Sequence, residues 1–337
     1  MNKNPMEKNK QNFVLSVPSV VKKGDIMIKK EVQFETITPL FTGDVKREMT
    51  EIKPASIMGS LRFWFEVICH FSGRFNTEKY SKEEFDYNKY ERLVEKNPSA
   101  ADDEICEQLQ LSPVARYFGC TGWKSKIGFE KIYLGKDENK FIYPQNKKLV
   151  SGKNWYLPNR YFEGKFTVVF TTESTEIAEN ILWPLLNFIQ EYGFLGVKNN
   201  IGFGRVRIIC DGLESYQELK IDGKNFYPSQ IVNEVNQKYK MINFNTICYY
   251  KLENVKSEYF VAIKKLLSDK SRQRSNEKSW QKRHCIFGSI NNDSFSNKIG
   301  VKTDEAKGPN ATKIIPLIRN KDIGFLGIPG IIHLPEV

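Results

Sequence analysis

Four glycines and flanking cations between residues 193 and 205 form the segment of this chain best suited to contact a phosphate backbone. It reads Gly-Phe-Leu-Gly-Val-Lys-Asn-Asn-Ile-Gly-Phe-Gly-Arg. Because glycine lacks a Cβ, its backbone approaches other groups closely and its N–H groups can bind phosphate oxygens. The segment is neither a dinucleotide fingerprint nor a P-loop, since it follows a predicted helix and lacks the closing Gly-Lys-Ser/Thr. Taken alone, its composition favours the simpler interpretation, a tight turn between a helix and a strand.

A second candidate lies between residues 264 and 283, where eight basic side chains meet only two acidic ones. Proteins that bind single strands combine such cations with aromatic rings that stack on bases. The side chains of interest are Arg272, Arg274, Lys278, Trp280, Lys282 and Arg283. A solvated, mobile loop has the same composition, so the sequence supports both interpretations equally.

The segment from Ile57 to Trp64 is a third candidate, inside a predicted amphipathic helix. Apolar side chains recur at helical spacing from residue 57 to residue 71, and Pro54 suits the first turn. Gly59 costs about 1 kcal/mol relative to alanine in a helix, so a close neighbour such as a ligand backbone is expected there. Arg62 lies off the apolar stripe and is the residue of this helix that favours a binding role.

Residues suited to catalysis are few. The three histidines are His70 in the predicted helix, His284 beside the basic segment, and His333 in an apolar tail. No spacing of His, Cys or carboxylates indicates a zinc site, and no nucleophile motif is present. Asp44 is the one carboxylate placed to face a ligand, although a turn role is favoured for it. We therefore expect no catalytic residue, metal or cofactor.

The composition restricts the class of protein. The 337 residues carry 51 Lys and Arg against 40 Asp and Glu, a net charge of +11 that favours a polyanionic partner. No run of about 18 apolar residues predicts a membrane span, and the polar first eleven residues do not resemble a secretory signal. The six cysteines form no C-x-x-C pair. We therefore expect a cytoplasmic protein with reduced thiols and no membrane partner.

Apolar patterning predicts strands over residues 27–37, 126–134, 165–171 and 203–210, with helices near 57–71 and over 178–192. The order strand, helix, strand, strand, helix, strand is that of a ferredoxin-like unit. Residues 76–110 hold ten acidic and five basic side chains. The stretch from about 73 to 110 is therefore expected to be an acidic, largely helical insertion.

Short repeated strings suggest that the second half of the chain is a shortened copy of the first. Gly-Phe-Leu-Gly occurs at 193–196 and at 324–327, and Phe-Gly at 118–119 and 287–288. The predicted fold is α+β, with two ferredoxin-like domains of which the second is shortened. The expected divisions are a flexible tail at 1–25, a first domain at 26–212, a connecting segment at 213–240 and a second domain at 241–337.

Three motifs are informative in combination: Thr-Pro-Leu-Phe-Thr-Gly at 38–43, Ala-Ser-Ile-Met-Gly-Ser-Leu-Arg-Phe-Trp at 55–64, and the glycine-rich segment at 193–204. Together they resemble the RAMP superfamily and, more narrowly, the family of first Cmr subunits of type III-B CRISPR effector complexes. The two Phe-Gly pairs match the same pattern. The resemblance implies two ferredoxin-like, RRM-like domains within an RNA-guided ribonucleoprotein.

The resemblance also implies a function. Such a subunit is not the nuclease; it holds the 3′ portion of the guide CRISPR RNA and helps capture complementary target RNA in antiviral defence. Its partners would be both RNAs and other Cmr subunits, including neighbouring RAMP subunits and the large polymerase-like subunit. RNA contacts are implied for Ser60, Arg62, Gly193, Gly196, Lys198, Asn199, Asn200, Gly202 and Arg205.

Two positions depart from the family pattern. Met58 stands where relatives often carry a cation, so one phosphate contact implied by the resemblance is not expected there. Lys-Asn-Asn at 198–200 stands where relatives are commonly arginine-rich, which implies a weaker or a more hydrogen-bonded contact. Two other functions stay open. One is a RAMP endoribonuclease, either target-cutting with Asp44 or guide-processing with His284. The other is an assembly module whose glycine loop docks on another protein subunit.

Overall fold

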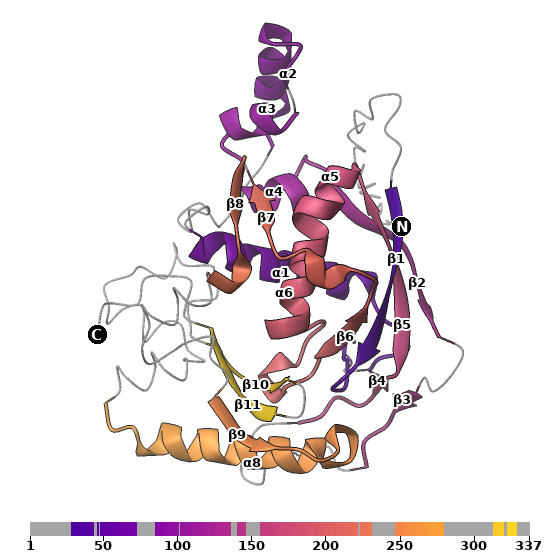
Figure 1. The fold of residues 1–337 in the computed structure, drawn as a ribbon, viewed down its shortest axis with the longest axis vertical. Helices are drawn as coiled ribbons and strands as arrows, with labels where there is room; N and C mark the ends of the chain where they lie inside the picture. Colours follow the sequence, from indigo (N-terminus) through magenta and orange to yellow (C-terminus); the bar gives the residue numbers. More distant parts are fainter. Residues whose placement is uncertain are drawn as a thin grey trace, which may run out of the picture.

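The computed structural model describes residues 28–43, 46, 48–72, 85–100, 102–135, 140–145, 156–221, 223–230, 247–279, 313–319 and 322–328. Their strands are β1 (Ile28–Thr36), β2 (Ile127–Leu134), β3 (Lys140–Ile142), β4 (Tyr161–Glu163), β5 (Lys165–Thr172), β6 (Val206–Ile209), β7 (Leu219–Ile221), β8 (Lys224–Phe226), β9 (Ile247–Lys251), β10 (Lys313–Arg319) and β11 (Asp322–Ile328). Their α-helices are α1 (Pro54–Phe71), α2 (Tyr87–Lys96), α3 (Asp102–Gln108), α4 (Pro113–Phe118), α5 (Thr175–Ile177), α6 (Trp183–Tyr192) and α8 (Val255–Asn276) (Figure 1).

The main sheet has the strand order β2-β5-β1-β6, and its neighbouring strands run antiparallel. Along the chain the elements follow the predicted alternation of strands and helices, so the fold is mixed α+β as expected. Helices α1 and α6 pack against one another on one face of this sheet (Figure 1). Strands β1, β2 and β5 agree with their predicted ranges within one residue at each end. Strand β6 starts three residues later than predicted, because Phe203 and Gly204 belong to a turn.

Strands β9, β10 and β11 form a second sheet, in the order β10-β11-β9, beside helix α8 (Figure 1). The Gly-Phe-Leu-Gly string at 324–327 lies inside β11, whereas its counterpart at 193–196 lies in the loop after α6. The two copies of this string therefore do not form equivalent structures, because a strand and a loop require different backbone conformations. The Phe-Gly repeat at 287–288 lies outside the described residues. A second related domain and the proposed domain limits stay predictions.

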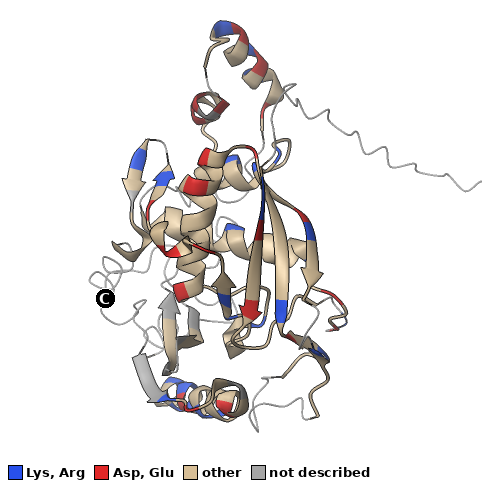
Figure 2. Cartoon of the chain, turned by 45° about the vertical axis from the view of Figure 1, so that its right-hand side comes forward, with Lys and Arg blue, Asp and Glu red and all other residues tan. Residues whose placement is uncertain are grey.

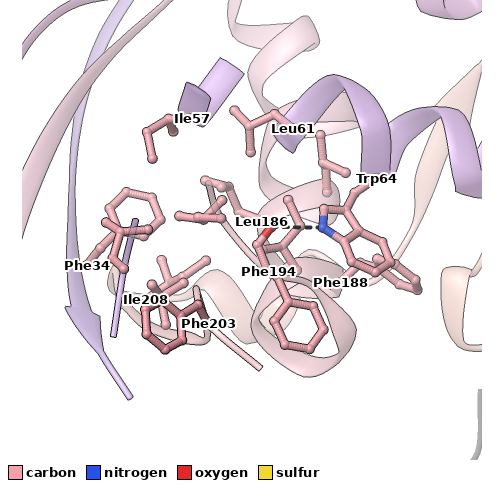
Figure 3. Packing of buried hydrophobic residues seen from close by; sticks show 14 of the residues in the cluster. Phe34, Ile57, Leu61, Trp64, Leu186, Phe188, Phe194, Phe203 and Ile208 are labelled. Atoms are coloured by element: carbon pink, nitrogen blue, oxygen red, sulfur yellow. Dashed lines mark hydrogen bonds between the residues drawn. The ribbon is translucent and has the colours of Figure 1, made fainter. Parts of the chain in front are cut away.

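The apolar stripe predicted for the first helix is the buried face of α1. Trp64 is 1% exposed and packs against Phe188 of α6 and against Phe194, with ring centroids 6.0 and 6.4 Å away (Figure 3). Gly59 lies on the exposed side of α1. Apart from its chain neighbours and the adjacent backbone of α1 itself, no atom of the described chain approaches within 4 Å of the position that a Cβ on Gly59 would occupy. The close neighbour expected at Gly59 is therefore not supplied by this part of the chain.

The second predicted helix, over 178–192, is interrupted. Residues Ala178–Leu182 form a π-helical turn, and α6 begins at Trp183. The backbone stays helical through this turn, and Pro184, which has no N–H, directly follows it; a π-helical turn is one of the irregularities with which a helix accommodates a missing donor. The helix ends before Gly193, as predicted. A Cβ on Gly193 would lie 2.7 Å from Ile189 Cα, so the glycine is required by close packing.

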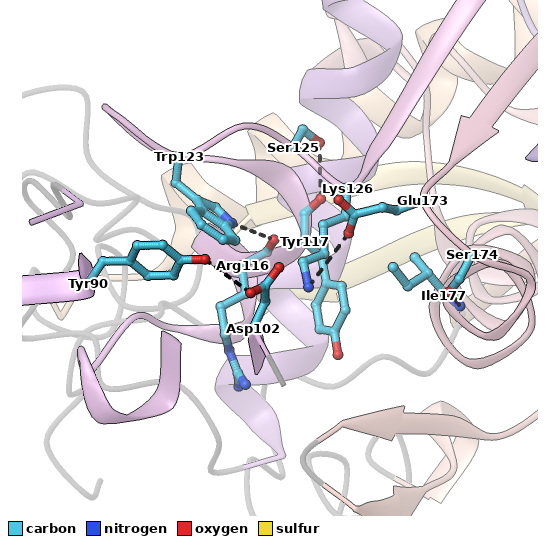
Figure 4. Close-up of polar contacts among 10 residues, drawn as sticks. All are labelled: Tyr90, Asp102, Arg116, Tyr117, Trp123, Ser125, Lys126, Glu173, Ser174 and Ile177. Atoms are coloured by element: carbon cyan, nitrogen blue, oxygen red, sulfur yellow. Dashed lines mark hydrogen bonds and ion pairs between the residues drawn. The ribbon is translucent and has the colours of Figure 1, made fainter. Parts of the chain in front are cut away.

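Helices α2 and α3 lie within the predicted acidic stretch and project away from the rest of the molecule (Figure 1). None of the α2 side chains is buried. Their junction with the body is aromatic, since Phe85 contacts Tyr90 and Trp123 at 5.2 and 4.8 Å between ring centroids. Burial and the Asp102 carboxylate, which accepts from the Tyr90 hydroxyl at 3.0 Å, raise the pKa of Tyr90 to about 12 (Figure 4).

Replacing Gly59 by alanine should raise the free energy of unfolding by about 1 kcal/mol, because alanine loses less backbone entropy in a helix and finds open space here. Equilibrium unfolding in urea measures the difference. Gly193→Ala is the control, since its added methyl group meets Ile189 and should destabilise the protein. A loss of stability in Gly59→Ala would contradict the open environment of this position.

Candidate nucleic-acid interface

The glycine-rich loop is held against helix α1 by two hydrogen bonds. Ser60 Oγ accepts from Gly196 N at 2.8 Å, and Trp64 Nε1 donates to Phe194 O at 3.0 Å (Figure 3). Ser60 also donates to Ser56 O, one turn earlier in α1. Because Ser60 is 8% exposed, this predicted RNA contact lies inside the fold, where it positions the loop.

The four glycines of the loop use their N–H groups within the chain. The acceptors are Ile189 O, Ser60 Oγ, Asn199 O and Pro39 O, for Gly193, Gly196, Gly202 and Gly204 respectively. Gly196 and Gly204 have φ values of +74° and +91°, and a Cβ on Gly196 would lie 2.5 Å from Phe41 O. The expectation that these N–H groups are free for phosphates is wrong. The simpler interpretation, a tight turn, describes the loop.

Arg205, at the end of the loop, is buried, with 1% of its surface exposed. Its terminal nitrogens donate to main-chain carbonyls of Ile189, Gln190, Glu191 and Gly193. Its Nε donates to Ile318 O of β10 at 3.1 Å. A cation is favourable here because the carbonyl end of a helix carries partial negative charge. The RNA contact predicted for Arg205 does not fit this position, since every guanidinium nitrogen is directed into the protein.

Arg62 extends from the wetter side of α1, as predicted, and is half-buried. Its Nη1 donates to Gly119 O at 2.6 Å, just past the end of α4. The Phe-Gly motif at 118–119 and the Leu-Arg-Phe-Trp motif at 61–64 are therefore adjacent in space. The sequence offered no signal for this pairing, because the two motifs are more than fifty residues apart.

The tip is the part of the glycine-rich loop that reaches the surface. Val197 is 47% exposed, Asn200 is exposed, and Lys198 and Asn199 are half-buried. Lys198 has a left-handed φ of +69° and precedes a single 3-10 turn at Asn199–Ile201. Of the RNA contacts predicted in the loop, these three polar side chains are the ones that a ligand can reach.

The basic segment is helical over much of its length, because α8 continues to Asn276. Lys264, Lys265, Arg272 and Lys278 are exposed along it, and Arg274 is half-buried (Figure 2). Arg272 is paired with Asp269 at 3.0 Å. The described residues do not include Trp280, Lys282, Arg283, Asp44 and His284.

The other side of α8 is anchored on the glycine-rich loop. Tyr259 Oη donates to Ile201 O at 3.1 Å, and burial raises the pKa of Tyr259 well above its ordinary value. A Cβ on Gly202 would lie 3.0–3.2 Å from Ile263, Pro316 and Tyr259. The loop therefore joins the main sheet to the second sheet and to α8.

A groove of about 310 Å³ lies between β1, β4 and α8. Its charged lining residues are Glu35, Glu163, Lys140 and Lys165, so it has no excess of positive charge to attract phosphates. Over the described ranges, no group of three or more His, Cys, Asp or Glu side chains is arranged to hold a metal ion. Among the helices described, none is long and apolar enough to cross a membrane.

Arg205→Lys should lower the free energy of unfolding by about 2–4 kcal/mol, because an ammonium group cannot reach carbonyls on α6 and β10 together and leaves buried acceptors unpaired. Arg207→Lys, two residues along, is the control. Its side chain is 65% exposed and pairs with Glu35 at the surface, so a loss below about 0.5 kcal/mol is expected. Urea unfolding at neutral pH measures both. Equally small losses would contradict the role of Arg205 in holding the fold together.

Lys270 of α8 links stability to pH. Burial, and then repulsion from Arg274, lowers the pKa of Lys270 from 10.5 to about 8. Between these values the unfolded chain binds more protons than the folded one. The free energy of unfolding therefore rises with pH across this window, and this gain disappears as the pH falls through about 8.

Lys270→Met should therefore be more stable than the wild type at neutral pH, by on the order of 2 kcal/mol. This difference should shrink as the pH rises from about 8 toward 10, because the wild-type lysine becomes neutral in the fold. Urea unfolding of the two proteins at several pH values measures it. A difference that is independent of pH would contradict the lowered pKa.

Comparisons with solved structures found weak similarity over long stretches. The crystal structure of Cmr1 from Pyrococcus furiosus in its apo form is 18% identical, with 92% of this chain and 91% of that chain covered and a TM-score of 0.42. Cmr6 from Pyrococcus furiosus is 14% identical over 55% of this chain and 98% of that one, with a TM-score of 0.29. A chain of a type IV-B CRISPR complex is 11% identical, with 54% of this chain and 90% of that chain covered and a TM-score of 0.36.

No curated protein matches the chain. A sequence-family model does: the RAMP superfamily model matches residues 33–207, more than half of the 337 residues. The matched range contains β2, β5, α1, α6 and the whole glycine-rich loop, together with parts of β1 and β6. This chain therefore belongs to the RAMP superfamily.

Proposed function

We propose that this chain is an RNA-binding subunit of a CRISPR effector ribonucleoprotein of type III-B, without nuclease activity of its own. It would hold the 3′ part of the guide RNA and help to capture complementary target RNA. Membership of the RAMP superfamily supports the class, and the three motifs that resemble first Cmr subunits support the particular subunit.

The observation that carries the RNA-binding role is the exposed cationic stripe of α8. Lys265 and Arg272 are seven residues apart, so they project from the same side of the helix, about 10 Å from one another along its axis. Ser268 lies between them and is also exposed, whereas the opposite side of α8 buries Ile263, Leu266 and Leu267. A stripe of this kind suits sequence-independent contact with phosphates, the contact needed to hold a guide of any sequence.

The tip of the glycine-rich loop supplies a second set of polar side chains. The loop is fixed by α1, and α8 packs on it through Tyr259, so the Lys198–Asn200 tip and the cationic stripe have a common rigid support. Rigid presentation lowers the entropy lost when RNA binds. These side chains are the proposed RNA contacts, whereas Ser60 and Arg205 are proposed to hold the framework.

The variant with Lys264→Ala, Lys265→Ala and Arg272→Ala, which removes three exposed cations of α8, should bind single-stranded RNA more weakly than the wild type. Each lost phosphate contact lowers the slope of log affinity against log salt by about 0.7 for single strands, so a decrease of about 1 to 2 is expected. Fluorescence anisotropy at several salt concentrations measures both quantities. The control removes three exposed cations from the projecting helix α2 (Lys89→Ala, Arg92→Ala and Lys96→Ala) and should leave the slope unchanged.

The same samples, run on denaturing gels with and without divalent metal ions, test the alternative function. Intact RNA with a salt-sensitive shift supports the binding subunit. Cutting that is lost in Asp44→Ala or His284→Ala would replace it with a RAMP endoribonuclease. An unchanged slope in the α8 variant would contradict the RNA contact assigned to that helix.

A further inference from the structure

A guanidinium and two aromatic rings are stacked at the end of the β3–β4 hairpin. The central carbon of the Arg160 guanidinium lies 4.8 Å from the ring centre of Phe141 and 4.9 Å from that of Tyr143. Phe141 and Tyr143 are two residues apart at the end of β3, so their side chains project on the same side of the strand. Arg160 directly precedes β4. Because the two strands are antiparallel and Ile142 pairs with Tyr161, Arg160 faces Tyr143, the next residue along.

Tyr143 is unusually exposed for an aromatic side chain that has fixed neighbours. It is 67% exposed, whereas Phe141 is half-buried and contacts the fully buried Phe162 at 5.3 Å between ring centroids. Phe141 thereby joins the stack to the core. Pro144 follows Tyr143 and restricts its backbone to extended conformations. The ring is therefore held in place on one side and open to solvent on the other.

Arg160 backs the Tyr143 ring with a fixed positive charge. Its guanidinium lies against both rings, and its Nε is buried and, among the described residues, has no hydrogen-bond partner. The guanidinium therefore acts on this stack through its charge and its flat face. A nucleobase has an aromatic face, so it matches an open tyrosine ring that is backed by a guanidinium.

The hairpin lies next to the surfaces already assigned to RNA. Phe162 of β4 pairs with Leu40, and Tyr161 contacts Phe260 of α8 at 6.1 Å between ring centroids. Lys140 of β3 is exposed, and so is Lys46, whose carbonyl accepts from Asn159 at 3.2 Å. Two exposed lysines therefore lie on the segments next to the aromatic stack, and cations combined with aromatic rings are typical of proteins that bind single-stranded nucleic acids.

We propose that Tyr143, backed by Arg160 and Phe141, stacks on one unpaired nucleobase of an RNA strand whose phosphates lie along α8. This inference rests on the proposed RNA-binding function and adds a base-contacting site to it. Since every base has an aromatic face, the site would select unpaired bases over duplex without selecting a sequence.

The test uses the full chain and two labelled oligonucleotides of equal length, an oligouridylate and the same backbone with abasic riboses. Tyr143→Ala should bind the oligouridylate about 5- to 100-fold more weakly, with no change in the salt slope, because no phosphate contact is lost. Its affinity for the abasic strand should equal that of the wild type. Tyr143→Phe, which keeps the aromatic ring, should retain tight binding. Tyr227→Ala removes a tyrosine that is 39% exposed and directly follows β8, a strand far from β3 in Figure 1, and is the matched control.

The outcomes separate this inference from the proposed function. If the wild type binds both strands equally well and Tyr143→Ala changes neither affinity, the base-stacking site is excluded while RNA binding stands. If the wild type binds neither strand, the proposed function fails and this inference fails with it. Thermal unfolding of each variant confirms that an exposed substitution has left the fold intact.

Discussion

The buried guanidinium of Arg205 is the interaction on which the rest of this structure depends. It donates to the last carbonyls of α6, to Gly193 O at the start of the glycine-rich loop, and to Ile318 O in the second sheet. An arginine is costly to bury unless its donors are satisfied, and here each nitrogen has an acceptor. One side chain thereby caps the carbonyl end of a helix, holds the start of a loop and links two sheets.

The fixed loop is what makes a rigid binding surface possible. Ser60 and Trp64 hold its first half against α1, and Tyr259 of α8 binds its second half at Ile201. The motif residues thus form an internal framework. The exposed side chains proposed to contact RNA lie at the Lys198–Asn200 tip, on α8 and on the β3–β4 hairpin. In this fold, residues that define the family and residues that would touch RNA are largely different sets.

The sequence was most informative where one periodic pattern had one structural solution. The stripe from Ile57 to Phe71 predicted α1, and alternation predicted β1, β2 and β5 within one residue at each end. It was least informative where a residue type suits two environments. Arg205 carries the charge expected of an RNA contact, yet it binds main-chain carbonyls of α6 and of β10. Its acceptor in β10, Ile318, lies 113 residues further along the chain. Gly-Phe-Leu-Gly likewise forms a loop at 193–196 and part of strand β11 at 324–327.

The sequence by itself determined the α+β class, the order of the main elements, the buried face of α1 and the turn made by the glycine-rich loop. These depend on neighbours a few residues away, and local patterns record such neighbours. Only the tertiary structure decided that the loop's N–H groups are occupied, that Ser60 lies inside, and that Phe141, Tyr143 and Arg160 meet. Those outcomes depend on contacts between distant segments, and burial and hydrogen bonding at such contacts follow from the packed fold and not from residue type.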